Sequence, residues 1–280
     1  ALIVAGCPKT TPVEPSDAPV VTEPTCAADD GAIEPLRLVA GQASAAQFSP
    51  CGHLSYLTWA TVENMVTAES HQLMPPSLVE GTKVSESANG REFSLDGRFF
   101  IYGIGEGRLS VRDLTTGQEV THELPYQRVG LVKGTDPDVP ELYFCANDTL
   151  SLLSAGTVTS LDTNVNCDSI ERARSRAALA YLDKDGVVHS ARFPGGEVRQ
   201  IQWAALPADE GDRYSTQRLS LSPDGSLVLR QVDRFEYCGD TVCGLSASVD
   251  VASTDSTVTH SYGVPIPECC GHLTDAISFA

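Results

Sequence analysis

The feature that most constrains the fold is a short module, a tight turn followed by an apolar strand, which returns along the chain. Its clearest copy lies at residues 93–118 (FSLDGRFFIYGIGEGRLSVRDLTTGQ) and opens with a Ser-Leu-Asp-Gly turn. Short strands joined by tight turns pair as antiparallel hairpins, so this copy predicts most of one four-stranded sheet. Its strands are expected at residues 98–104, 109–113 and 119–124.

Four weaker copies follow the same pattern. The sequences FSPCG at 48–52 and LSPDG at 221–225 precede expected strands at 53–59 and 226–232. Apolar runs at 142–146 and 178–182 match these strands but have poorer turns. Successive copies are roughly 36 to 50 residues apart, which is the repeat length of propeller blades and longer than most solenoid repeats.

The strand after each turn is apolar at nearly every position. Such a run indicates a strand buried on both faces, whereas a half-exposed strand alternates apolar and polar residues. The turn residues suit its entry, because Asp bonds nearby backbone and Gly accepts a positive φ. A single small sheet cannot cover both of its own faces, so several sheets must pack against one another.

These turns and strands resemble the WD40-like, TolB-type β-propeller repeat family, whose hallmark is a Ser-Pro-Asp-Gly turn before an inner strand. The chain departs from the pattern at Cys51, at Leu95 and at Arg112-Asp113, where Asp, Pro and Trp-Asp are usual. The resemblance implies an all-β chain, a β-propeller of four-stranded antiparallel blades with about five blades present and a sixth begun. We expect a fragment, with an open ring and an unpaired strand edge.

The first residues indicate export. Residues 1–6 (ALIVAG) are apolar or small, as in the end of a secretory signal peptide. The run Val4-Ala5-Gly6-Cys7 resembles the bacterial lipobox, which implies a lipid on Cys7 and attachment to a membrane. The alternative is an ordinary segment with a free or disulfide-bonded cysteine. Pro8 stands where some inner-membrane lipoproteins have Asp, so the resemblance favours an outer-membrane lipoprotein facing the periplasm or the cell surface.

Residues 7–35 are rich in Pro, Thr and acids and show no hydrophobic period, so we expect a tether followed by a propeller domain at 36–280. The formal net charge of -18 disfavours nucleic acid or anionic lipid as a partner, because both require a basic surface. The apolar fraction of 41% is ample for a core.

Nine cysteines indicate an oxidising compartment. With Cys7 assigned to lipid, eight remain, which is compatible with four disulfides whose connectivity the sequence leaves open. Adjacent cysteines are poorly placed to bond each other. The expected pairs, in order of preference, are Cys238 with Cys243, Cys145 with Cys167, and Cys269 and Cys270 with other partners such as Cys26 and Cys51.

Motifs for hydrolases, zinc proteases, nucleotide and dinucleotide binding are absent from the sequence, so no catalytic residue and no cofactor is assigned. Three segments were weighed as metal sites: Cys269-Cys270-Gly271-His272 with Glu268, the run Asp183-Lys184-Asp185-Gly186, and the acidic loop Asp209-Glu210-Gly211-Asp212. A hairpin turn or a solvated loop explains the last two better, and oxidation of the thiols argues against the first. No metal is therefore predicted. His53, His189 and His260 are expected in strands with packing or surface roles.

The sequence thus predicts a binding module for a protein or peptide, because propellers present loops on rigid blades. Two alternatives remain. One is a propeller-type enzyme, a lyase, lactonase or glycoside-acting protein, with acidic groups at the channel mouth. The other is a structural envelope protein.

Overall fold

A computed structural model describes residues 42–62, 65–74, 82–85, 91–104, 107–203, 213–238, 241–254 and 259–264. Within these ranges the chain is built from β-strands and one short 3-10 helix, η1 (Cys167–Ser169). None of the helical structure found there is long and apolar enough to cross a bilayer.

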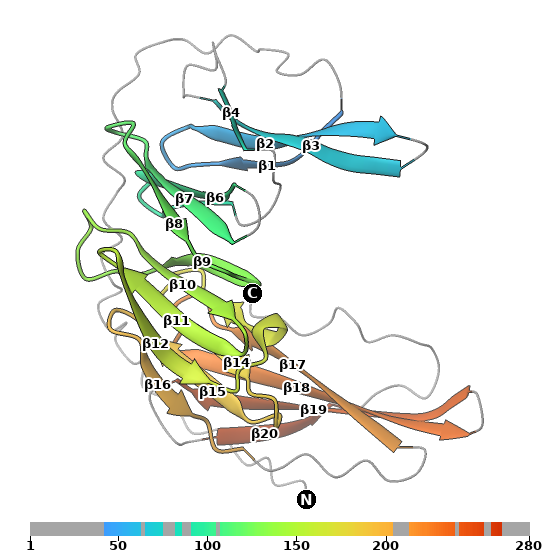
Figure 1. Cartoon of the computed structure of the whole chain (residues 1–280). Helices are drawn as coiled ribbons and strands as arrows, with labels where there is room; N and C mark the ends of the chain where they lie inside the picture. The colour runs from blue at the N-terminus through green and yellow to red at the C-terminus, as the bar shows by residue number, and fades with distance from the viewer. Residues whose placement is uncertain are drawn as a thin grey trace, which may run out of the picture.

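The strands form five four-stranded sheets in the described part of the chain (Figure 1). Sheet 1 comprises β1 (Gln42–Phe48), β2 (Leu54–Val62), β3 (Met65–Met74) and β4 (Thr82–Ser85), and sheet 2 comprises β5 (Glu92–Phe93), β6 (Phe99–Gly103), β7 (Arg108–Asp113) and β8 (Glu119–Glu123). Sheet 3 comprises β9 (Arg128–Val132), β10 (Glu141–Ala146), β11 (Thr149–Ser154) and β12 (Thr157–Thr163). Sheet 4 comprises β13 (Glu171–Arg172), β14 (Ala178–Leu182), β15 (Val188–Arg192) and β16 (Glu197–Gln200), and sheet 5 comprises β17 (Arg213–Leu221), β18 (Leu227–Cys238), β19 (Thr241–Ser253) and β20 (Thr259–Val264).

Each sheet follows one topology, with its four strands antiparallel and side by side in chain order. Consecutive sheets stack into an arc, with sheets 1 and 5 at its two ends (Figure 1). This is the blade arrangement of a β-propeller, so the predicted fold class is confirmed. The expected sixth blade, at residues 275–280, lies outside the described residues.

All five expected apolar strands are present, and each is the second strand of its sheet: β2, β6, β10, β14 and β18. The strand expected at 178–182 is matched residue for residue by β14, whereas β18 extends six residues beyond the 226–232 expectation. The second strand is therefore an internal strand of the sheet and not its edge, which accounts for the apolar runs that the sequence shows there.

Packing between sheets accounts for these continuous apolar runs. In β6, Phe99 and Ile101 belong to the core shared with sheet 3, while Phe100 and Tyr102 belong to the core shared with sheet 1. Successive side chains of a strand point to opposite faces, so a strand between two neighbours needs apolar residues at every position. The same division in β10 and β14 gives four cores, one at each of the four junctions between successive sheets.

The turn before the second strand has the chemistry expected from the sequence. In sheet 5, Asp224 Oδ1 accepts hydrogen bonds from Ser226 N (3.0 Å) and Ser222 Oγ (2.6 Å), and Gly225 has φ of 79°. In sheet 4 the glycine position is occupied by Arg176, with φ of 60°. This substitution explains why the turn of sheet 4 is weak in the sequence.

Candidate functional site

In the described part of the chain, a cavity of about 390 Å³ lies between sheets 2 and 3 and is open to solvent; we name it the β8 groove. Its apolar wall consists of Phe99, Val111, Val120, Val139, Pro140, Leu142, Leu153, Ala155 and Gly156. Its polar rim consists of Arg98, Asp113, Thr116, Gln118, His122 and Asp138. The volume lies within the range of small-ligand pockets, roughly 300–1,000 Å³.

The groove is an extension of the core between sheets 2 and 3. Val111 is paired with Val120 across β7 and β8, so both side chains point to the same face, toward sheet 3. Val111 is buried, whereas 56% of Val120 is exposed. The core is therefore closed near β7 and open near β8, where a side chain of another molecule can reach it.

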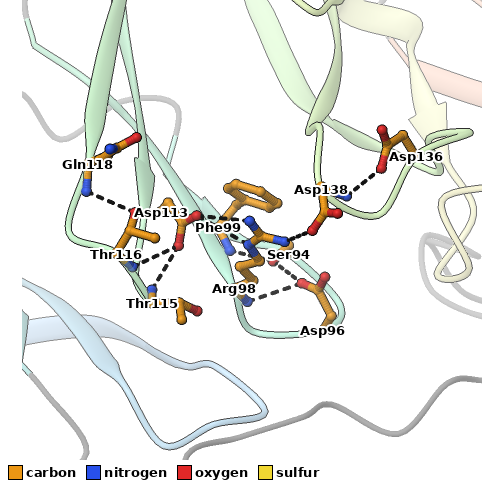
Figure 2. A network of polar contacts seen from close by, with 10 residues as sticks. All are labelled: Ser94, Asp96, Arg98, Phe99, Asp113, Thr115, Thr116, Gln118, Asp136 and Asp138. Carbon is orange, nitrogen blue, oxygen red and sulfur yellow. Dashed lines mark hydrogen bonds and ion pairs between the residues drawn. The ribbon is translucent and has the colours of Figure 1, made fainter.

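Three charged groups from three different segments meet on the rim (Figure 2). Arg98, just before β6, donates from Nε to Asp113 Oδ2 (3.2 Å) at the end of β7, and it also bonds Asp138 in the β9–β10 loop. The guanidinium carbon lies 4.9 Å from the centre of the Phe99 ring. Asp113 in turn accepts hydrogen bonds from the backbone of the β7–β8 turn, at Thr115 N (2.8 Å) and Thr116 N (3.2 Å).

This network fixes the charge states of the rim. The hydrogen bond to Asp138, aided by Asp113, raises the pKa of Arg98 despite its partial desolvation. Partial burial opposes ionisation of Asp113, but the two backbone N–H groups and Arg98 hold its pKa below the usual value. The charged pair of Arg98 and Asp113 is therefore favoured on the rim, and Arg98 also bonds Asp138.

His122 is the remaining titratable group of the groove. Burial lowers its pKa from the ordinary 6.5, so the imidazole is neutral at pH 7. It lies on β8 two residues from Val120 and faces the same side of the sheet. The groove therefore presents an apolar floor and a neutral donor or acceptor, which suits recognition of a side chain.

A second polar cluster, which we name the Glu92 cluster, lies on the opposite edge of the sheets. Glu92 in β5 binds Arg172 in β13 (2.6 Å) and Arg176 (2.7 Å), and it also accepts from the backbone N of Leu131 in β9 (3.1 Å). A Cβ on Gly130 would lie 2.8 Å from Arg172 Nη1, so glycine leaves room for the arginine to pass. The cluster ties the first strands of sheets 2, 3 and 4 together.

The junction between sheets 3 and 4 is closed by a chain of polar contacts. Tyr181 OH donates to Asp162 (2.6 Å), and His189 lies between Asp162 (3.4 Å) and Asp183 (3.2 Å). The rings of Tyr181 and His189 are stacked, with centroids 5.5 Å apart. Burial and the bond to Asp162 raise the pKa of Tyr181, so its hydroxyl stays protonated.

The cysteines expected in disulfides are only partly described. Cys145 in β10 and Cys167 in η1 are bonded, with their Cα atoms 5.6 Å apart, and Cys51 is disulfide-bonded as well. Cys238 and Cys243 lie on the adjacent strands β18 and β19, in the expected hairpin. The lipidation candidate Cys7 and the disulfide candidates Cys26, Cys269 and Cys270 lie outside the described residues.

Of the three segments considered as metal sites, one lies within the described residues and two lie outside them. The run Asp183-Lys184-Asp185-Gly186 is the turn between β14 and β15, where Asp183 Oδ1 accepts from the backbone of Asp185 (2.9 Å) and Val187 (2.8 Å). Its hairpin interpretation is confirmed. Residues 209–212 and 268–272 lie outside the described residues. In the described ranges, no group of three or more His, Cys, Asp or Glu could hold a metal ion.

Sequence reasoning missed the members of the groove and of the Glu92 cluster. Arg98, Asp138 and His122 lie in different segments, and no local motif links them. The position of Arg98 could have been inferred, because it directly follows the recognised Ser-Leu-Asp-Gly turn and so stands at the start of an internal strand. In the sequence, Asp113 stands out only as the Asp of a degenerate Trp-Asp pair.

Comparison with known proteins gives likeness in fold. No family model matches the chain, and no curated protein matches it in sequence. An oligogalacturonate lyase in complex with manganese aligns at TM-score 0.44 and 14% identity, covering 80% of this chain and 66% of the lyase. TolB from Acinetobacter baumannii aligns at 0.41 and 13%, covering 81% and 56%, and Hsv2 of Kluyveromyces lactis at 0.46 and 10%, covering 80% and 85%. The chain thus spans less than two thirds of the lyase and of TolB.

Proposed function

We propose that this chain is a protein- or peptide-binding β-propeller, exported and held at the bacterial cell envelope by a lipid on Cys7. The observation that carries the binding role is the β8 groove, an open apolar cavity between two blades. Its rim charges are paired with each other, so an incoming apolar side chain displaces water without stranding a charge.

The chemistry of the cysteines supports export. The disulfide between Cys145 and Cys167 requires an oxidising compartment, which for bacteria is outside the cytoplasm. The lipobox-like run ending at Cys7 and the Pro-rich residues 8–35 provide an anchor and a spacer. At about 0.8 kcal/mol per buried methylene, a multiply acylated cysteine holds a protein on a membrane durably.

The binding role is tested by crosslinking from the groove. A photoreactive amino acid replaces Val120, and in a control it replaces Phe48, which is 64% exposed on β1 of sheet 1, outside the groove lining. Both side chains are largely exposed, so the two sites differ in their neighbourhood and not in access. We expect a discrete crosslinked protein from Val120 and none from Phe48 in intact cells. Equal yields from the two sites, or none from either, would refute a binding site in the groove.

The anchor is tested separately. Cells that express the full-length protein are labelled with an alkyne-bearing palmitate, and the Cys7→Ser variant is compared with Cys51→Ser as a cysteine control. We expect label and membrane attachment to be lost only in Cys7→Ser. Retention of label in that variant contradicts lipidation at Cys7 and leaves the groove experiment unaffected.

A further inference from the structure

The outer edge of β8 presents unpaired backbone groups next to the groove. β8 is the last strand of sheet 2 and pairs with β7 on one side only in the described part of the chain. At its two ends, Gln118 O accepts from Asp113 N (2.8 Å) and Leu124 N donates to Gly107 O (2.7 Å). Bonding residues alternate in an antiparallel ladder, so even-numbered residues of β8 face β7 and odd-numbered ones face outward. The outward set is Glu119, Thr121 and Glu123.

A strand added to this edge places its side chains in register with the groove. Side chains of paired strands share a face, so alternate residues of the added strand stand beside Val120 and His122, over the cavity. Backbone pairing supplies affinity and the cavity selects the side chain, which is the general mode of β-augmentation.

The negative charge of the groove and of β8 favours particular residues beside the inserted apolar side chain of the added strand. The groove lining holds Asp113 and Asp138 against the single cation Arg98, and 72% of the Asp138 side chain is exposed. Glu119 and Glu123 are exposed on β8 itself, and the whole chain carries a net charge of -18. Residues adjacent to the inserted side chain point to the opposite face of the sheet, where Glu119 and Glu123 lie, so basic residues are favoured at those positions.

At the corresponding edge of sheet 3, a leucine side chain of the chain itself meets the turn of the next sheet. A Cβ on Gly196, in the turn of sheet 4 that faces β12, would lie 2.6 Å from Leu161 Cδ2. In sheet 3 the turn that faces β8 contains Gly156, and nothing lies within 4 Å of a Cβ placed there. The side chain of Leu161 thus fills, beside β12, the space that is open at the equivalent place beside β8.

Building on the proposed function, we propose that the partner is an extended peptide segment that pairs with the free edge of β8 and inserts an apolar side chain, flanked by Lys or Arg, into the groove.

The experiment selects short randomised peptides on the immobilised full-length chain and measures their affinity for three variants. Val120→Asp puts a charge into the groove. Thr121→Pro removes an outward N–H without removing a bond to β7, and Thr121→Ala is its matched control. We expect selected peptides with an apolar residue between basic ones, bound about tenfold more weakly by Val120→Asp and Thr121→Pro and unchanged by Thr121→Ala.

A second measurement avoids any change in the protein. Backbone N-methylation of the selected peptide at one set of alternate residues should abolish binding, and methylation of the other set should leave it intact. Circular dichroism of the variants checks that each remains folded. Thr121→Pro and Thr121→Ala both lose the hydroxyl that meets Ser110 Oγ (2.9 Å), so their melting curves should overlay each other.

The failures are distinguishable. If Val120→Asp abolishes binding but Thr121→Pro and both methylated peptides bind normally, strand pairing is wrong and the groove remains the binding site. If no selected peptide depends on Val120, or none is recovered, the proposed function is wrong as well. If the chain sediments as a dimer that Thr121→Pro dissociates, the occupant is a second copy and the peptide proposal is overturned.

Discussion

Two junctions of the same design, one between sheets 2 and 3 and one between sheets 3 and 4, differ in how they end at the outer edge. Both contain an apolar core to which second strands contribute alternate residues. At the outer edge of the junction of sheets 3 and 4, Leu161 meets the turn at Gly196 and Asp162 contacts Tyr181 and His189, while a disulfide lies within its buried core. The junction of sheets 2 and 3 ends in the β8 groove.

The difference teaches that the fold is maintained by the inner part of each junction and that the outer part is free to vary. Both junctions share the Glu92 cluster at their other edge, where one carboxylate meets two guanidinium groups. The open groove at the outer edge is tolerated because the Glu92 cluster holds the sheets together at the opposite edge. The predictions below test that division of roles.

The largest effect is expected from Glu92→Gln. The change leaves Arg172 and Arg176 partly buried without a counter-charge, which should cost about 3 kcal/mol of unfolding free energy, measured by urea titration. The rate of amide hydrogen exchange should rise in β6, β10 and β14 together, because the Glu92 cluster joins the three sheets to which these strands belong. Glu123→Gln on exposed β8 is the control and should change stability little. If the faster hydrogen exchange were confined to sheet 2, the Glu92 cluster would not be stabilising the three sheets together.

The next effect separates the two junctions. Replacement of both Cys145 and Cys167 by Ala removes a crosslink between residues 22 apart, worth about 3 kcal/mol in the chain-entropy account. We expect faster hydrogen exchange in β10, β12 and β14 and little change in β6 and β7. If β6 and β7 exchange faster to the same extent, the junctions are not independent.

The sequence predicted the parts of this design that repeat. The expected strand at 178–182 coincides with β14, because a short apolar run that recurs at the blade spacing fits an internal strand better than a helix. The Glu92 cluster joins residues up to 84 positions apart in the chain, and only the stacking of sheets brings them together. The groove was not predictable from the sequence either, since it depends on the open space beside Gly156, where nothing lies within 4 Å of a Cβ placed on that residue.

A smaller effect is expected from alanine substitution of Gly156 and Gly196, the two glycines at which the outer edges of the junctions differ. Gly156 and Gly196 have similar φ values, 77° and 69°, so alanine imposes a similar backbone strain of about 1 kcal/mol at each. Gly196→Ala should cost about 1 kcal/mol more, because its Cβ meets Leu161. The melting temperatures of the two variants measure this. The combination of Gly196→Ala with Leu161→Ala should remove the excess, and a persisting excess would contradict the contact.

The smallest effect concerns the pH response of the open junction. Burial holds the pKa of His122 below its unfolded value of 6.5, so the unfolded chain binds a proton that the folded chain resists. Stability is therefore unaffected above pH 6.5 and falls as the pH drops from 6.5 toward the folded pKa. His53 shifts in the same direction for the same reason, so His122→Gln should remove only part of the fall. The pKa of His122 is measured by NMR titration of its imidazole protons. A bound basic peptide should lower it further, because it adds positive charge and excludes water, and a peptide that raised it would place the occupant away from β8.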